Sequence, residues 1–259
     1  MEYQTIRLSY AGDCAEITLD RPDVKNALNG QMRAELLDAY KEASDVARVI
    51  VLSGAGDAFC SGQDLTDAQH SLSNANLERT LRDEYMPLLR AIFDCKVPTM
   101  SAVNGAAAGA GANLALASDI VIASERAVFL QAFARIGLIP DAGGTYWLPR
   151  QVGFARAMGT ALFAEPVPAR EAAEWGMIWE AVPDNEFEGH WRKRATQLAT
   201  GPTEAYRRAK EAIRSTYDNS LEEQLILEAR LQGRCGKTRD FREGVMAFLD
   251  GRPAQYEGR

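Results

Sequence analysis

Hydrophobic positions recur with two different periods along this chain, and the dominant period changes near its middle. In the first half, short runs that alternate with polar residues, or are apolar throughout, predict strands. Apolar stripes with helical spacing lie between these runs, and the first stripe follows a capping candidate, Asn29. The predicted strands cover residues 6–10, 15–19, 46–52, 99–103 and 119–123, and further helices are predicted over 77–92 and 109–118.

The second half of the chain has the helical period almost throughout. Ser220 and Glu223 form a capping-box pattern ahead of one predicted helix. Gly201-Pro202 separates the mixed pattern from the last helices, so we expect an α/β core over residues 1–200 and a helical region over 201–259. The predicted helices cover 153–164, 168–175, 186–200, 203–217, 221–235 and 243–249, and one strand is predicted at 177–182.

The composition limits the partners and the compartment. The 259 residues carry a formal net charge of −7, which disfavours general attraction to nucleic acid or to an anionic membrane surface. The four scattered cysteines show no zinc-type spacing with the two histidines, so we expect no metal site and a reducing, cytoplasmic setting. The N-terminal residues lack a signal-peptide pattern, and no apolar run reaches membrane-spanning length, so we expect no membrane association.

Two stretches of small residues, 58–65 and 104–113, are the most informative local feature. Small side chains leave backbone N–H groups uncovered, and two such groups aimed at one point can stabilise an oxyanion. Asp141 lies between the apolar residues Pro140 and Ala142, and a carboxylate in such a setting can move a proton on and off carbon. The combination predicts enolate chemistry.

Other motifs do not support a different chemistry. Gly109-Ala110-Gly111 lacks the third glycine of a dinucleotide-binding loop, since Leu114 stands at that position. The chain contains neither a Walker-type phosphate loop nor a Gly-x-Ser-x-Gly sequence. His190 lies in a charged segment and is expected to be a solvated surface residue. His70 follows the first small-residue stretch, and a ligand contact remains the less favoured alternative to a structural or exposed position.

These residues resemble the crotonase family, the enoyl-CoA hydratase/isomerase superfamily, over nearly the whole chain. The resemblance implies a spiral of repeated β-β-α units with a helical C-terminal trimerisation region. It also implies an acyl-CoA thioester as substrate, no other cofactor, and a homotrimer or a dimer of trimers. The matching blocks are Arg21-Pro22 with Ala27-Leu28-Asn29, then residues 59–65, 104–120, 139–144, 174–177 and 243–249.

By position in this family, the oxyanion donors are the backbone N–H groups of Gln63 and Ala110. The simpler alternative is that their loops are tight turns in which glycine supplies a positive φ. For Asp64, bracing the loop is favoured over catalysis, and for the basic helix over 207–214 a solvated face is favoured over a coenzyme A contact. The resemblance implies substrate and coenzyme A contacts at Arg21, Lys25, Ala27, Ser61, Asp64, Leu65, Gly109, Asn113 and Phe133.

One departure from the family pattern decides the expected chemistry. Hydratases of this family add water with two glutamates, and the matching positions here are Asn113 and Phe133. Neither side chain is a general acid or base at neutral pH. Asp141 stands at a position that single-acid relatives use, and its apolar neighbours are expected to raise its pKa. The alternative is that Asp141 caps a helix opened by Gly143-Gly144, but the missing glutamates favour the catalytic role.

A single acid/base residue suits an isomerase that moves a proton between carbons of a thioester. The alternatives are an atypical enoyl-CoA hydratase, a thioesterase, or a noncatalytic acyl-CoA binder. Phe129, Phe133 and Trp147 are candidates either to surround a ring-shaped acyl group or to pack in the core. Three segments resemble the isomerases of this family that convert ring-1,2-epoxyphenylacetyl-CoA to an oxepin and shift double bonds in enoyl-CoAs: residues 137–141, 174–179 and 242–244.

Overall fold

The computed structural model describes residues 3–65 and 74–258. In these ranges the chain forms a six-stranded sheet with strand order β1-β2-β3-β5-β7-β10. β1 and β2 pair antiparallel, and the other neighbours pair parallel. The strands are β1 (Ile6–Ala11), β2 (Cys14–Leu19), β3 (Val49–Gly54), β5 (Thr99–Val103), β7 (Ile120–Ser124) and β10 (Glu180–Val182).

Both faces of the six-stranded sheet are buried at its central strands β3 and β5, because helices cover each face there. In β3, Val49 and Val51 face the cluster that contains Trp191 of α8 (Phe187–Ala199). Ile50 and Leu52 belong to the cluster on the other face, which includes the apolar side of α1 (Gly30–Val46). Burial on both sides explains why this strand is a continuous apolar run rather than an alternating one.

A second, smaller sheet has the strand order β4-β6-β8-β9. The first three strands are parallel, and β9 pairs antiparallel with β8. The hydrophobic pattern predicts none of them, because each strand has three residues, and alanine and proline are poor strand formers. The strands are β4 (Ala58–Cys60), β6 (Ala106–Ala108), β8 (Val128–Leu130) and β9 (Pro166–Pro168).

The chain around the small sheet is packed too closely for ordinary side chains. A Cβ atom built on Gly105 would lie 2.0 Å from the Asp57 carbonyl oxygen. One built on Gly111 would lie 2.4 Å from the Cys60 carbonyl oxygen. Backbone atoms cannot give way like the end of a flexible side chain, so this packing accounts for small residues on both sides of β4.

The helix predicted over 77–92 is confirmed, but it has a wider turn at its centre. It consists of α3 (Asn74–Thr80), a π-helical turn (Leu81–Tyr85) and α4 (Met86–Phe93). The apolar stripe does not predict this turn, which changes the direction in which the side chains around it point. Single π turns inside α-helices often occur at functional sites.

The helix caps predicted at Asn29 and at Ser220 with Glu223 are confirmed. The Asn29 side chain accepts a bond from Met32 N at the start of α1, and Ser220 and Glu223 form the capping box of α10 (Leu221–Cys235). The strand predicted from residue 46 begins at Val49, because α1 extends to Val46. The remaining helices are α5 (Ala110–Leu116), α6 (Gly144–Phe163), α7 (Ala169–Glu174), α9 (Thr203–Ser215) and α11 (Arg239–Asp250).

The prediction that a helix begins at residue 153 is wrong. α6 begins at Gly144, and Gly153 marks a kink in it with φ 77°. The predicted start therefore coincides with an interruption of the helix rather than with its origin. α11 likewise begins before the predicted residue 243, because the Thr238 side chain accepts a bond from Phe241 N and caps an earlier start.

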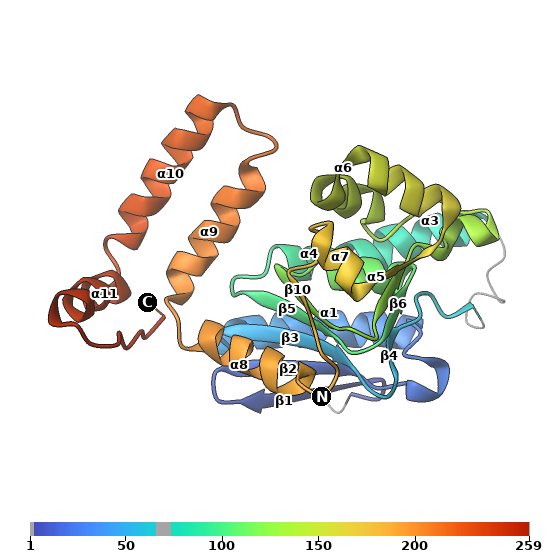
Figure 1. Ribbon diagram of the computed structural model, residues 1–259, viewed down its shortest axis with the longest axis horizontal. Coiled ribbons are helices and arrows are strands. Elements are labelled where there is room, and N and C mark those ends of the chain that lie inside the picture. Colours follow the sequence, from blue (N-terminus) through green and yellow to red (C-terminus); the bar gives the residue numbers. More distant parts are fainter. Residues whose placement is uncertain (1–2, 66–73, 259) are drawn as a thin grey trace.

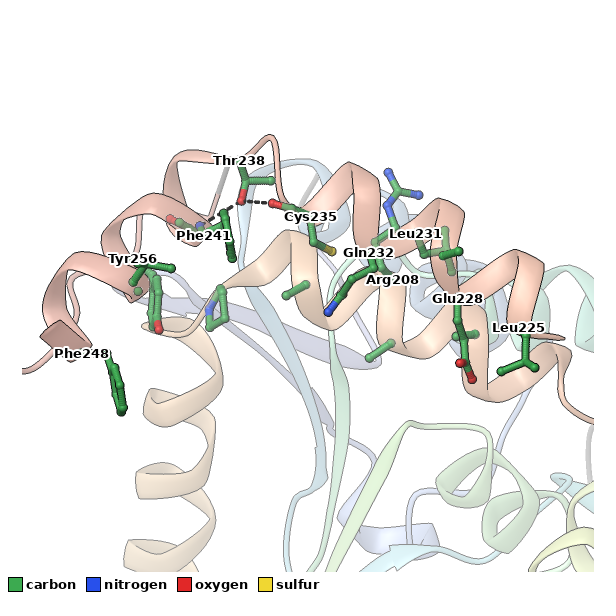
Figure 2. A pocket seen from close by; sticks show the side chains of 18 of the residues that line it. Arg208, Leu225, Glu228, Leu231, Gln232, Cys235, Thr238, Phe241, Phe248 and Tyr256 are labelled. Carbon is green, nitrogen blue, oxygen red and sulfur yellow. Dashed lines mark hydrogen bonds between the residues drawn. The ribbon is translucent and has the colours of Figure 1, made fainter.

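The last helices lie on one side of the layered core (Figure 1). Lys210 and Arg214 of α9 attach them to the core through Asp119, with nitrogen–oxygen distances of 2.7 and 2.6 Å. The domain division at residue 200 stays a prediction. A mostly apolar groove of about 960 Å³ lies among α9, α10 and α11, and Figure 2 shows the side chains along it.

Two further observations concern the described residues as a whole. None of their helices combines the length and the apolar character needed to cross a membrane. The four cysteines are free thiols, of which Cys14, Cys60 and Cys95 are buried and Cys235 is partly exposed.

Candidate active site

The small sheet brings the two small-residue loops together. β4 and β6 are adjacent parallel strands, and Gln63 and Ala110 follow their carboxyl ends. A Cβ atom built on Gly62, where φ is +95°, would lie 3.4 Å from Ala110 N and 2.7 Å from the Ala108 carbonyl oxygen. Glycine is therefore required at residue 62 both by its backbone conformation and by the neighbouring loop.

The backbone N–H groups of Gln63 and Ala110 are unused by secondary structure. Gln63 forms a parallel bridge with Leu28, in which Leu28 N donates to Gly62 O and Asp64 N donates to Leu28 O, so the Gln63 amide faces away from Leu28. Ala110 is the first residue of α5 and has no acceptor within that helix. Within residues 3–65 and 74–258, neither amide donates to a backbone carbonyl outside its own element. Two neighbouring amides of this kind suit a developing oxyanion.

Asp141 lies on the turn before α6, at a cavity of about 520 Å³. Its Oδ1 atom is buried and has no hydrogen-bond partner among the described residues. Burial raises the pKa of this carboxyl to about 6, because the charged form loses solvation without gaining a partner. The cap of α6 is Gly143, with no side-chain capping bond, so the alternative role of Asp141 as a helix cap is wrong.

Asn113 supports the turn that carries Asp141. Its side chain is fully buried, and Nδ2 donates to the Asp141 carbonyl oxygen at 2.7 Å. The Asn113 and Gln131 side chains also bond reciprocally, at 2.8 and 3.3 Å. A Cβ atom on Gly144 would lie 2.5 Å from Asn113 Nδ2, so Gly144 makes this contact possible. The polar atoms of Asn113 are thus engaged with the protein, and its predicted substrate contact stays a prediction.

Phe133 lies beside Gly109, in the second stretch of small residues. Its ring is nearly buried, and its closest ring carbon would lie 3.7 Å from a Cβ atom built on Gly109. The position of the family's second glutamate is therefore an apolar surface here. Asp141 is left without a second carboxylate from either position to share proton transfer.

Aromatic side chains form much of the cavity wall around Asp141. The rings of Phe93 and Trp147 have centroids 5.3 Å apart, and those of Tyr146 and Trp147 are 4.8 Å apart and nearly perpendicular. Tyr85 also lines this cavity. Of the three aromatic candidates from the sequence, only Trp147 lines it, because Phe129 is buried in β8. Tyr85 and Phe93 were missed as site residues, although Tyr85 belongs to the predicted apolar stripe and Phe93 lies one residue beyond the predicted helix.

The loop predicted to contact coenzyme A is braced internally. Arg21 forms an ion pair with the buried Asp64 at 2.9 Å, and it also donates to the Ala27 carbonyl oxygen. This agrees with the bracing role expected for Asp64. Lys25 and Ser61 are exposed on this loop, and the Ser61 hydroxyl donates to the Val24 carbonyl oxygen at 3.2 Å.

The remaining candidates are more peripheral. Leu65 is 57% exposed. His70 lies outside the described residues, so its predicted alternatives stay open. His190 is not simply solvated, since its Nε2 lies 2.8 Å from Glu180 Oε1. The basic helix over 207–214 is not an open solvated face either, because Lys210 and Arg214 are directed at Asp119 on the core.

Comparison with known proteins places this geometry in context. The family model described as enoyl-CoA hydratase/isomerase matches residues 10–259. The chain is 60% identical over the full length of both chains to a Rhodobacter capsulatus protein named as a probable enoyl-CoA hydratase. It is 44% identical to the 1,2-epoxyphenylacetyl-CoA isomerase of Escherichia coli, over 94% of each chain. The crystal structure of an enoyl-CoA hydratase from Bacillus anthracis superposes with a TM-score of 0.93 at 30% identity, over 99% of this chain and 100% of that one.

Proposed function

Because the chain belongs to the enoyl-CoA hydratase/isomerase family, we propose that it is an acyl-CoA isomerase with one acid/base residue, Asp141. The Gln63 and Ala110 amides hold the thioester oxygen, and coenzyme A is part of the substrate rather than a cofactor. The observation that carries the proposal is the buried Asp141 carboxyl, whose Oδ1 atom has no hydrogen-bond partner among the described residues and whose pKa is raised to about 6. The positions of the two glutamates in the family pattern are occupied here by Asn113 and Phe133.

The reaction moves one proton within the substrate. Asp141 removes a proton from the carbon next to the thioester carbonyl, which breaks that C–H bond and places the electron pair in the enolate. The two amides stabilise the negative charge on the thioester oxygen. Protonated Asp141 then returns the proton to the γ carbon, so a 3-enoyl thioester becomes a 2-enoyl thioester and Asp141 is again a carboxylate. A pKa near 6 suits both halves of this cycle at neutral pH.

An aromatic acyl group is the preferred substrate in this proposal. We propose 2-(1,2-epoxy-1,2-dihydrophenyl)acetyl-CoA as the substrate. The bond between its two epoxide carbons breaks as the ring double bonds shift, which gives the seven-membered oxepin, and Asp141 moves a proton from the α carbon to the γ carbon in the ring. The aromatic cavity wall of Phe93, Tyr146 and Trp147 supports a flat, ring-shaped acyl group. The Escherichia coli relative named 1,2-epoxyphenylacetyl-CoA isomerase supports the same substrate.

An atypical enoyl-CoA hydratase is the second candidate, because the Rhodobacter capsulatus relative is named as a probable hydratase. The two functions separate in one experiment that compares hydration of crotonyl-CoA with isomerisation of a 3-enoyl-CoA by the same preparation. The isomerase proposal expects the double-bond shift to exceed hydration by at least about 100-fold in kcat/KM, since a second carboxylate typically contributes 10²–10⁴-fold. Faster hydration, or binding without turnover of either thioester, contradicts it.

We also propose that the chain assembles as a homotrimer or a dimer of trimers. The C-terminal helices expose large apolar side chains, including Leu225, Phe241 and Phe248, the last at 86%. Large contiguous apolar surfaces on soluble proteins usually mark interaction sites. Sedimentation analysis tests the assembly directly, and a monomer at micromolar concentration contradicts it.

A further inference from the structure

The side chain of Gln63 is held as firmly as its backbone. Its Oε1 atom accepts a bond from Arg33 Nη1 at 2.9 Å and a second from the Tyr85 hydroxyl at 2.6 Å. A carbonyl oxygen has two lone pairs, so both are used. This residue carries one of the two amides assigned to the oxyanion, and its side chain has no need to touch the substrate.

Arg33 connects this side chain to the segment beside it. The same Nη1 atom that binds Gln63 also donates to the Leu28 carbonyl oxygen at 2.8 Å, on the other side of the bridge between Leu28 and Gln63. The Arg33 side chain is 4% exposed, and its guanidinium group forms an ion pair with Glu84 at 2.7 Å. A buried charge with several hydrogen-bonding partners has little freedom to move, because each partner compensates for lost solvation.

Tyr85 connects the same side chain to the cavity of Asp141. Tyr85 lines that cavity and is 3% exposed, and its ring centroid lies 5.0 Å from the Arg33 guanidinium carbon. Tyr85 and Glu84 both belong to the π-helical turn, which lets two consecutive residues reach Gln63 and Arg33. The π-helical turn thus provides both the Glu84 contact to Arg33 and the Tyr85 contact to Gln63.

We propose that Tyr85 is a positioning residue for the first oxyanion amide, acting together with Arg33 through the Gln63 side chain. An acyl group in the cavity rests against Tyr85, and the hydroxyl of the same residue holds the Gln63 side chain and, through it, the Gln63 backbone amide. Occupancy of the cavity and orientation of the oxyanion donor are thereby coupled. The inference rests on the proposed oxyanion role of Gln63, and it adds a residue that touches neither the thioester oxygen nor the migrating proton.

Small displacements of an oxyanion donor have large effects on rate. Loss of a donor reduces kcat by 10²–10³-fold, and a misplacement of about 1 Å can cost about 100-fold. Tyr85→Phe keeps the ring and removes only the hydroxyl, so Arg33 still holds Gln63 on one side. We expect kcat to fall about tenfold with KM within twofold of the wild type, because the amide is loosened rather than lost.

A double-mutant cycle tests the proposed link. Gln63→Ala keeps the backbone amide and removes the side chain that Tyr85 holds, so Tyr85→Phe should have almost no further effect in that background. The matched control is Tyr3→Phe, whose hydroxyl donates to Asp38 at 3.1 Å outside the cavity and should leave kcat unchanged. Full activity in Tyr85→Phe, an effect confined to KM, or additive losses in the double variant would overturn the proposal.

A spectroscopic measurement separates this inference from the proposed reaction. Cinnamoyl-CoA is a conjugated thioester whose absorption band moves to longer wavelength when its carbonyl oxygen is polarised. Measured on Asp141→Asn, so that turnover does not interfere, the shift should be clear with Tyr85 present and at least halved with Tyr85→Phe. An equal shift in both proteins contradicts the positioning role. If the wild type fails to isomerise a 3-enoyl-CoA but this difference persists, the proposed function fails and the positioning role stands.

Discussion

The two sheets of this protein have very different sequences and pack in different ways. The six-stranded sheet is built from β-branched and other large apolar residues, such as those of β3, and side chains fill the space on both faces. The four-stranded sheet is built from three-residue strands, one of which, β6, is entirely alanine, with glycines where neighbouring backbone passes within contact distance. The difference teaches that the large sheet stabilises the fold through side chains, whereas the small sheet places backbone atoms next to one another.

The largest expected effect is that of Asp141→Asn, in the cavity between the π-helical turn, α4 and the start of α6. We expect kcat for 3-enoyl-CoA isomerisation to fall about 10³-fold, because the amide cannot accept the proton, while circular dichroism remains that of the wild type. Asp13→Asn, in the exposed turn between β1 and β2, is the matched control and should retain full activity. Substantial turnover by Asp141→Asn would remove the acid/base assignment.

Gly62→Ala tests whether close backbone packing beside the small sheet is needed for activity. Its Cβ atom would lie 2.7 Å from the Ala108 carbonyl oxygen, so the oxyanion loops must separate, and we expect a loss of about 100-fold in kcat. Gly12→Ala is the matched control at the β1–β2 turn, where φ is also positive (+60°) and no atom lies within 4 Å. Both variants carry the cost of a positive φ, but only Gly62→Ala adds a clash with backbone, so we expect Gly62→Ala alone to lose kcat and also to have the lower thermal stability. Equal kcat values would argue against the convergence of the two amides.

Asn113→Ala tests whether buried hydrogen bonds near Asp141 affect activity as well as stability, whereas those within the large sheet affect stability alone. The variant loses the bond to the Asp141 carbonyl oxygen and leaves Gln131 without its partner, so we expect kcat to fall about tenfold and the free energy of unfolding to fall by about 1–3 kcal/mol. Ser101→Ala in β5 removes the buried bond to Ser118 at 2.8 Å and serves as the control. It should lose comparable stability with no change in kcat. Unaltered kcat in Asn113→Ala would show that the Asp141 turn needs no such support.

The smallest expected effect is on stability and depends on pH. The pKa of Asp141 is about 6 in the folded protein and near 4 in the unfolded chain, so the protonated carboxyl favours the fold. This stabilisation is complete below pH 4 and is lost as the pH rises through 6, on the order of 2 kcal/mol. Asp141→Asn should therefore melt a few degrees above the wild type at pH 8 and at about the same temperature at pH 4. A variant that is less stable at pH 8 would contradict the unpaired, buried state of the carboxylate.

The sequence predicts the large sheet well because its information lies in side-chain pattern. β5 is predicted with its observed bounds, and the caps at Asn29 and Ser220 are found because their side chains form the capping bonds. The strands of the small sheet could not be predicted from hydrophobic periodicity, because a strand as short as β6 has no measurable period. The loops at its ends were nevertheless identified, because small residues imply close backbone approach even when the partner is unknown.

The apolar neighbours of Asp141 in the sequence predicted its buried setting, and the structure confirms that setting, while its catalytic role stays a prediction. Contacts that depend on tertiary structure were not predicted. The bonds from Arg33 and Tyr85 to Gln63 could not be predicted, because they join segments far apart in the chain and depend on the π-helical turn. The cavity contact of Phe93 depends likewise on the packing of two helices.

The unequal accessibility of the four thiols offers a practical opportunity. Burial raises the pKa of Cys14 and Cys60 to about 12 and also raises that of Cys95, so these three are poor nucleophiles. Cys235 is partly exposed and lines the groove among α9, α10 and α11 (Figure 2). A maleimide fluorophore should therefore attach at one place in the unmodified chain, where its emission would report whether a neighbouring subunit covers that groove.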